Sequence, residues 1–185
     1  MTEGAVLAAA TEAFDAIDRL ESRISTWQRG TQASRINSER AEHPVGDAAD
    51  VLDMVELSIK YWKDTDGAFD ITVGPLVELW RACKAVPRLP SDQEVADARA
   101  LVGCDKLIVL HDDHSVGFQK KGMRVDFGGI GKGLAVDEAK LVLEQYGISC
   151  ALLDGGTSSM VAMGAPPGKD GWIIQLKHPY DDGYF

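Results

Sequence analysis

The stretch VDFGGIGKGLAVDEA, residues 125–139, carries the most informative pattern of the chain. Apolar residues at positions 123, 125 and 127 alternate as in a short strand, a glycine-rich run with one lysine follows, and a helical pattern begins directly afterwards. The first N–H groups of a helix are unpaired and lie at the positive end of its dipole. The order of strand, glycine loop and helix therefore predicts an anion-binding loop. A tight turn whose glycines serve only packing explains the spacing equally well.

The loop matches neither common phosphate fingerprint. A P-loop would need Ser or Thr after Lys132, where this chain has Gly133, and a glycine where it has Asp126. The dinucleotide fingerprint also fails, because the glycines at 129, 131 and 133 alternate. Two aspartates, Asp126 and Asp137, flank the loop. The ligand must therefore be inferred from other segments.

Composition limits the kinds of partner. The chain has 185 residues, 45% of them hydrophobic, and a formal net charge of -10. These values predict a single globular domain over residues 1–185 and argue against nucleic acid as a partner. A phosphate ligand would need local neutralisation by a helix N-terminus, a lysine or a divalent metal. The three cysteines are far apart, without metal-binding spacing, and are expected to be reduced, buried thiols.

Helices are expected mainly in the first half. Apolar residues at helical spacing predict a helix over residues 3–23, followed by a loop over residues 25–39. Asp47 can cap a second helix, and Pro75 suits the first turn of a third over residues 72–82. Ser91 and Glu94 form a capping box for a fourth helix that stops at Gly103.

Strands are expected in the second half. KLIVL and SVGFQ flank the residues HDDH, which predicts a hairpin; a turn explains these four polar residues better than a metal site. Three further strand candidates are CALLD, SMVAMG and WIIQLK. Helices in the first half and a largely antiparallel sheet in the second indicate an α+β fold.

Five segments together resemble the ApbE family, the FAD:protein FMN transferases. They are STWQRGTQASRIN (25–37), GAFDITVGPLVELW (67–80), VDFGGIGKGLAVD (125–137), CALLDGGTSS (150–159) and GWIIQLKHP (171–179). Without the family, residues 67–74 would be a plain connection between helices. The resemblance implies an enzyme that binds FAD with Mg²⁺, transfers FMN to a threonine of an acceptor protein and releases AMP.

The resemblance also implies site residues. Trp27 occupies the place of an aromatic residue that packs on the flavin, and Ala68, Phe69 and Asp70 line the cofactor. Asp126 and Lys132 are FAD-contacting positions, and the carbonyl of Gly129 is a metal ligand. On this reading the glycine loop serves the FAD pyrophosphate. The catalytic residue and the oligomeric state stay unassigned.

The chain departs from the family pattern in several places. Relative to that pattern, we expect a strand before residue 1 and a metal-binding segment after residue 185 to be missing. Gly155, Gly156 and Thr157 replace the usual Gly-Gly-Asp, and Met160 stands where a flavinylation target would carry threonine. The start of the chain lacks a basic signal-peptide region, which predicts a cytoplasmic protein, although family members are often exported lipoproteins.

Three other functions remain open on these grounds. Water in place of threonine would make the protein an FAD pyrophosphatase. An incomplete metal site would leave a flavin-binding module without activity. The fourth reading is an unrelated α+β interaction domain.

Overall fold

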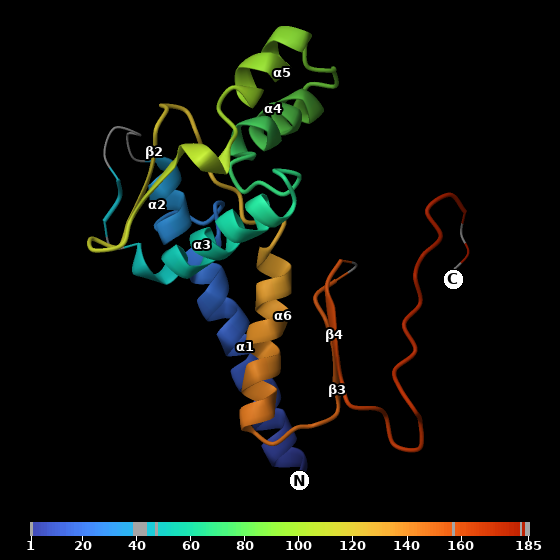
Figure 1. Cartoon of the computed structure of the whole chain (residues 1–185). Helices are drawn as coiled ribbons and strands as arrows, with labels where there is room; N and C mark the ends of the chain where they lie inside the picture. Colours follow the sequence, from blue (N-terminus) through green and yellow to red (C-terminus); the bar gives the residue numbers. More distant parts are fainter. Residues whose placement is uncertain (1, 39–43, 47, 157, 182, 184–185) are drawn as a thin grey trace. The chain divides into compact units, whose positions relative to one another are not determined.

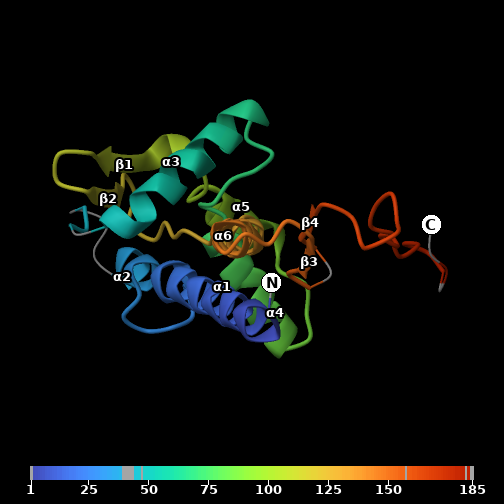
Figure 2. The same ribbon diagram turned by 90° about the horizontal axis from the view of Figure 1, so that it is seen from below.

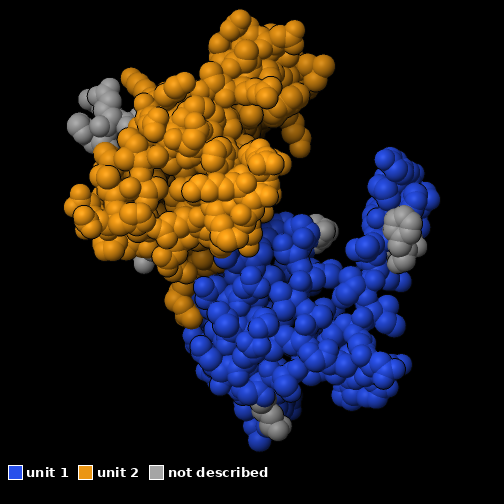
Figure 3. Space-filling view, viewed as in Figure 1, with its two compact units in different colours: residues 1–17, 132–185 blue, residues 18–131 orange. Residues whose placement is uncertain are grey.

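The computed structural model describes every residue except 1, 39–43, 47, 157, 182 and 184–185. The chain divides into two compact units (Figure 3). Asp18–Gly131 form the central unit, and Met1–Ile17 with Lys132–Phe185 form the terminal unit. That the two units make a single folding domain stays a prediction.

The helices and strands follow in the order shown in Figure 1. Helix α1 (Glu3–Ile24) contributes to both units. The central unit also contains α2 (Gln32–Ser38), α3 (Ala49–Asp64), α4 (Gly74–Ala85), α5 (Asp92–Arg99), a 3-10 turn (Cys104–Lys106), β1 (Leu107–Leu110) and β2 (Ser115–Phe118). The terminal unit contains α6 (Gly131–Gln145) apart from its first residue, β3 (Ala151–Asp154) and β4 (Met160–Met163).

The α+β class is confirmed. Five of the α-helices described lie within the first hundred residues, and both strand pairs lie in the second half. Strand β1 pairs with β2 and β3 with β4, both antiparallel, so the described strands form two separate two-stranded sheets. None of the described helices has the length and apolar content needed to cross a membrane.

The loop predicted for residues 25–39 is wrong in part, because it contains α2. The Thr31 hydroxyl accepts a hydrogen bond from the backbone N–H of Ser34 at 3.0 Å, which caps the helix. Ala33 and Ile36, three residues apart, are buried. These two apolar positions and the capping threonine were the available signal, and the surrounding polar residues obscured it.

Helices α3 and α4 begin close to where the sequence predicts. The proposed cap of α3, Asp47, lies outside the described residues, and the first helical residue is Ala49. The core face of α3 contains Val51 and Val55, both fully buried. Pro75 lies in the first turn of α4, as predicted.

The capping box of α5 is confirmed. The Ser91 hydroxyl accepts from the Glu94 backbone N–H at 3.2 Å, and the Glu94 carboxylate accepts from the Ser91 N–H at 2.7 Å. The helix ends at Arg99, earlier than the predicted stop at Gly103. The Gly103 N–H instead donates to the Thr72 hydroxyl at 2.6 Å, so the chain has already left the helix there.

The predicted hairpin of the central unit is also confirmed. Strands β1 and β2 pair from Leu107 opposite Phe118 to Leu110 opposite Ser115, and the residues HDDH form the turn (Figure 2). His111 lies against α3, with Nδ1 3.0 Å from Glu56 Oε1. All four residues of β2 are buried, so the hairpin closes one side of the central core.

The terminal unit has its own small core. It consists of Ala9 and Ala13 of α1, Ala139 and Leu143 of α6, and Met163 of β4. Among the residues whose apolar spacing predicts α1, Leu20 is buried, but Leu7 and Phe14 are each 68% exposed. Alanines pack here instead because their small side chains let helices approach closely.

The last predicted strand, WIIQLK, does not form. Residues 172–176 have no strand structure, and Ile173 is 87% exposed. The Trp172 indole N–H donates to the carbonyl of Met163 at 2.9 Å. A strand needs a neighbour to satisfy its backbone groups, and no described strand pairs with this segment. An apolar alternation alone could not reveal that.

Candidate functional site

The strand predicted before the glycine loop does not form, because residues 123–127 make only an isolated parallel bridge, between Arg124 and Val73. This segment is held by the side chain of Asn37, 88 residues earlier in the chain. Its amide N–H donates to the carbonyl of Val125 at 2.8 Å, and its amide oxygen accepts from the Val125 N–H at 2.8 Å. On the other side, the N–H of Asp126 donates to the carbonyl of Ile71 at 2.7 Å. Asn37 and Ile71 belong to two other family segments, so three of these segments meet here.

Gly74 allows α4 to begin against the same segment. A Cβ at position 74 would lie 2.7 Å from Cβ of Arg124 and 2.8 Å from its carbonyl oxygen. No side chain fits in that space, so the glycine sets how closely α4 approaches the backbone of Arg124. Arg124 also forms an ion pair with Glu78 of α4, with Nε 2.8 Å from Oε1.

Asp126 caps the turn that begins the glycine loop. Its Oδ1 accepts a hydrogen bond from the N–H of Gly128 at 2.7 Å. A Cβ on Gly128 would lie 2.8 Å from the same oxygen. Its other carboxylate oxygen makes no hydrogen bond to a described residue. Asp126 therefore has one oxygen engaged in the turn and one available to a ligand.

A cavity of about 540 Å³ lies beside this turn in the central unit. Its described lining comprises Trp27, Ala68, Phe69, Asp70, Val73, Val77, Arg81, Asp126, Gly128 and Gly129. Six of the seven residues predicted from the family resemblance are among them: Trp27, Ala68, Phe69, Asp70, Asp126 and Gly129. Three segments that are distant in the sequence thus contribute lining residues to one cavity.

Phe69 and Gly129 meet across this cavity. The Phe69 ring packs edge-on against Tyr61, with centroids 6.1 Å apart and planes at 84°. A Cβ on Gly129 would lie 3.2 Å from Cε2 of Phe69, closer than most such contacts. Because Gly129 has no side chain, the aromatic ring and the loop backbone share the cavity wall.

Asp70 holds the backbone of the cavity wall. Its Oδ1 accepts from the N–H and the hydroxyl of Thr72 at 2.7 and 2.6 Å, and its Oδ2 accepts from the N–H of Cys104 at 3.1 Å. Both carboxylate oxygens are therefore occupied. Asp70 lines the cavity, and its hydrogen bonds fix residues 70–72 and 103–104. Its contact with the cofactor stays a prediction.

Cys104 is a buried thiol in contact with that carboxylate. Its Sγ donates to Asp70 Oδ1 at 3.2 Å. Burial, together with the hydrogen bond and negative charge of Asp70, raises the pKa of Cys104 to about 12. The thiol is therefore protonated at neutral pH and is unsuited to act as a nucleophile. Cys83 is also buried, whereas Cys150 is exposed, contrary to the expectation of buried thiols throughout.

Arg81 lines the cavity but was missed by the sequence analysis. Its guanidinium carbon lies 3.4 Å from the centre of the Trp27 ring, and Trp27 itself is 64% exposed. Arg81 is on α4, four residues after Val77, which also lines the cavity. The four-residue spacing on a helix was the available signal, but nothing in the sequence related it to Trp27.

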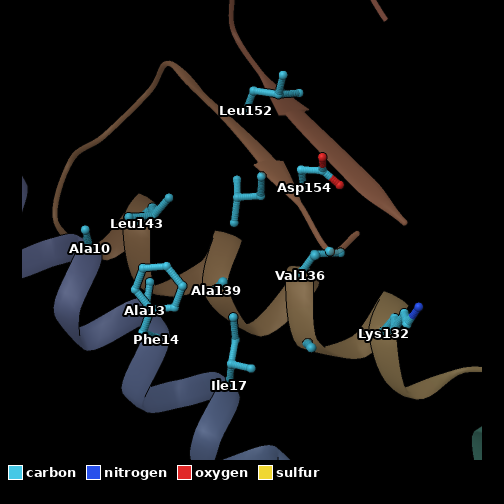
Figure 4. A pocket seen from close by; sticks show the side chains of 13 residues that line it. Ala10, Ala13, Phe14, Ile17, Lys132, Val136, Ala139, Leu143, Leu152 and Asp154 are labelled. Atoms are coloured by element: carbon cyan, nitrogen blue, oxygen red, sulfur yellow. The ribbon is translucent and has the colours of Figure 1, made fainter. Parts of the chain in front are cut away.

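Lys132, the seventh predicted residue, lies in the terminal unit and lines a different, largely apolar cavity of about 390 Å³. Figure 4 shows Phe14 and Ile17 from α1, Lys132 and Val136 from α6, and Leu152 and Asp154 from β3 around it. Lys132 and Asp137 are both exposed. The contact of Lys132 with FAD stays a prediction.

The described residues fit a magnesium ion only in donor type. The carbonyl of Gly129 and the second oxygen of Asp126 are hard oxygen donors of the kind Mg²⁺ prefers. Mg²⁺ requires near-octahedral coordination, and among the described residues no group of three or more His, Cys, Asp or Glu side chains is placed to hold a metal. These residues alone do not make a complete magnesium site.

Comparison with known proteins agrees with the five segments. The sequence profile of the ApbE family matches residues 2–184. A FAD:protein FMN transferase from Klebsiella pneumoniae is 33% identical over 172 residues, which cover 91% of this chain and 48% of that protein. The chain spans about half the length of the curated relatives it matches.

Solved structures give the same result. The ApbE protein from Thermotoga maritima superposes with a TM-score of 0.86 and 25% identity, covering 96% of this chain and 57% of that one. The flavinyl transferase ApbE from Pseudomonas stutzeri, in its apo form, superposes with a TM-score of 0.80 and 26% identity, with the same coverage. The profile match over nearly all residues shows that this chain belongs to the ApbE family.

Proposed function

We propose that this protein is an FAD:protein FMN transferase. It would transfer FMN from FAD to a threonine of an acceptor protein and release AMP. Membership of the ApbE family supports the reaction class. The observation that carries the proposal is the cavity of the central unit, where Trp27, the residues 68–70, Asp126 and Gly129 come together from three segments.

The size and lining of this cavity suit a flavin. Cofactor sites are usually concave, about 300–1,000 Å³, and largely apolar with a few polar groups. This cavity, of about 540 Å³, offers the rings of Trp27 and Phe69 for stacking on a planar isoalloxazine. The backbone of residues 128–129 borders it without side chains, so a ligand can approach the main chain closely.

The reaction requires negative charge to be neutralised. The hydroxyl of the acceptor threonine attacks the phosphorus of the FMN half, the pyrophosphate P–O bond breaks, and AMP leaves with the bonding electrons while the hydroxyl proton is released. The protein's net charge of -10 does not favour this chemistry by itself. We assign the positive charge to Lys132 and Mg²⁺; when bound, Mg²⁺ would stabilise the charge on the phosphate oxygens.

Residues of this chain would then orient the reactants. Trp27 and Phe69 fix the ring end of FAD, and Asp126 shapes the glycine loop through Gly128 while its second oxygen faces ligand or metal. Asp70 keeps the wall rigid through Thr72 and Cys104. Such positioning is the main source of rate in phosphoryl transfer, because little covalent chemistry falls to the enzyme.

The test is AMP release from FAD, measured with and without a threonine-containing acceptor peptide, with EDTA as the control. The proposal predicts release that requires both Mg²⁺ and the peptide, together with flavin-labelled peptide. Release without peptide would indicate a pyrophosphatase instead. FAD binding without AMP release would indicate a flavin-binding module, and absence of both would favour an interaction domain.

A further inference from the structure

Arg81 brings a positive charge to a cavity that is otherwise acidic. Among the described residues that line it, the charged ones are Asp70, Asp126 and Arg81, so Arg81 is the single cation of that lining. The oxygens of Asp70 are already bonded within the wall. Arg81 forms no ion pair with a described residue. Its charge is therefore not used for an internal salt bridge.

The contact that Arg81 does make is with Trp27. A guanidinium carbon 3.4 Å from the ring centre corresponds to a close cation–π stack. Arginine suits this geometry because its guanidinium is planar and weakly hydrated. Trp27 is 64% exposed, so burial does not fix the orientation of its indole. The stack with Arg81 is a side-chain contact that can fix it.

Helix α4 fixes the position of Arg81. Val73, Val77 and Arg81 follow at four-residue intervals, so they share one face, and all three line the cavity. Glu78, three residues before Arg81, forms an ion pair with Arg124, which precedes the glycine loop. The carboxylate of Glu78 is therefore paired with Arg124 and does not compete with Trp27 for the guanidinium of Arg81.

A second, more polar cavity of about 190 Å³ adjoins the first. Trp27, Val77, Arg81 and Asp126 line both cavities. The Trp27–Arg81 stack therefore forms part of the wall that the two cavities share. A change in the indole orientation would alter the shape of the larger cavity directly.

We propose that Arg81 is a positioning residue, which holds the Trp27 indole in the orientation that stacks on the isoalloxazine ring. The inference rests on the proposed flavin function. It assigns Arg81 to the ring end of the ligand and not to the phosphates. Riboflavin and FAD carry the same ring, so the loss of Arg81 weakens the binding of both ligands by the same factor.

The test compares Arg81→Ala and Arg81→Lys with the unsubstituted chain. Lys84→Ala is the matched control, because Lys84 is an exposed cation on the same helix and does not line either cavity. The first readout is the indole N–H signal of Trp27 in the ligand-free protein, assigned with Trp27→Phe. The second is the dissociation constant of FAD and of riboflavin, from flavin fluorescence.

We expect Arg81→Ala to shift and broaden the Trp27 signal, Arg81→Lys to have a smaller effect, and Lys84→Ala to have none. The dissociation constants of FAD and riboflavin should both rise about 2–5-fold in Arg81→Ala, the range of an exposed cation–π contact. An unchanged Trp27 signal would overturn the inference whatever happens to flavin binding. A loss of affinity for FAD alone would also overturn it, because that result would indicate that Arg81 contacts the phosphates of FAD directly.

The result for the unsubstituted chain separates this inference from the proposed function. If that chain binds neither flavin, the proposed function fails, and the flavin part of the inference fails with it. If the Trp27 indole signal nevertheless changes in Arg81→Ala, the result still supports the conclusion that Arg81 orients Trp27.

Discussion

At the scale of single residues, Asp126 combines a structural bond with a free carboxylate oxygen. Its Oδ1 accepts from the N–H of Gly128 at 2.7 Å. In Asp126→Asn the amide oxygen can keep this bond while the charge is lost, and in Asp126→Ala both are lost. The pair of variants therefore separates the two roles of one side chain.

We expect Asp126→Asn to retain most of the stability and to weaken FAD or metal binding. Asp126→Ala should in addition be less stable by about 0.5–1.5 kcal/mol, because the exposed N–H of Gly128 exchanges this hydrogen bond for one to water. Urea unfolding and flavin titration measure the two effects. Equal stability of the unsubstituted chain and both variants would show that the hydrogen bond to Gly128 does not contribute to stability. Unchanged FAD binding by Asp126→Asn would show that the Asp126 charge does not contribute to ligand binding.

Cys104 offers a test of the wall behind Asp70. Its pKa is raised to about 12 by burial and by Asp70, so the folded state favours the protonated thiol. In the unfolded chain a thiol ionises near about 8.5. The stabilising contribution is therefore complete below that pH and is lost as pH rises toward the folded value, because the unfolded chain releases its proton first.

We predict that the free energy of unfolding falls above about pH 8.5 and falls less steeply in Cys104→Ala. At pH 8 iodoacetamide should label the exposed Cys150 much faster than Cys104. Peptide mapping after brief labelling gives the two rates. Equal rates in the folded protein, or an identical pH dependence in the variant, would contradict the raised pKa.

At the scale of elements, the glycine motif depends on α2. The Asn37 side chain at the end of this helix makes two bonds of 2.8 Å to the backbone of Val125, which is 1% exposed. No other described side chain bonds to both backbone groups of Val125. The position of the segment before the loop therefore depends in part on this amide.

Asn37→Ala should destabilise the protein by about 1–3 kcal/mol, because it leaves a buried N–H and a buried carbonyl without partners. Ser38→Ala, the neighbouring exposed position, is the control and should change stability by less than about 0.5 kcal/mol. Denaturant unfolding measures both variants. A loss for Asn37→Ala no larger than for the control would mean that water satisfies Val125.

The elements that the sequence predicted well are those whose signal is local. Apolar periodicity located α1, and the capping box located α5, because a helix satisfies its own backbone. The segment WIIQLK failed for the opposite reason, since a strand needs a partner that the pattern of one segment cannot supply. Helix α2 was missed because its two buried residues lie among polar ones.

The site was predictable only in part, and mainly through the family resemblance. The family resemblance of the segments at 67–80 and 125–137 predicted site residues that the structure places around one cavity. Asn37 and Arg81 were missed, because their roles depend on contacts with Val125 and Trp27 that are distant in sequence. The second role of Asp70, as a wall residue, depends in the same way on Cys104.

At the scale of the whole molecule, we propose that the cavity of the central unit binds FAD. Position 129 allows a direct test, because a Cβ there would lie 3.2 Å from the ring of Phe69 and a larger side chain would fill the cavity. Gly133 is the matched control, since a Cβ at that position meets no atom within 4 Å.

The measurement is a flavin fluorescence titration of the unsubstituted chain, Gly129→Val and Gly133→Val with FAD and with FMN. We expect the unsubstituted chain and Gly133→Val to bind FAD more tightly than FMN. Gly129→Val should lose at least about tenfold in FAD affinity, or about 1.4 kcal/mol. Undiminished FAD binding by Gly129→Val, or FMN binding as tight as that of FAD, would contradict it.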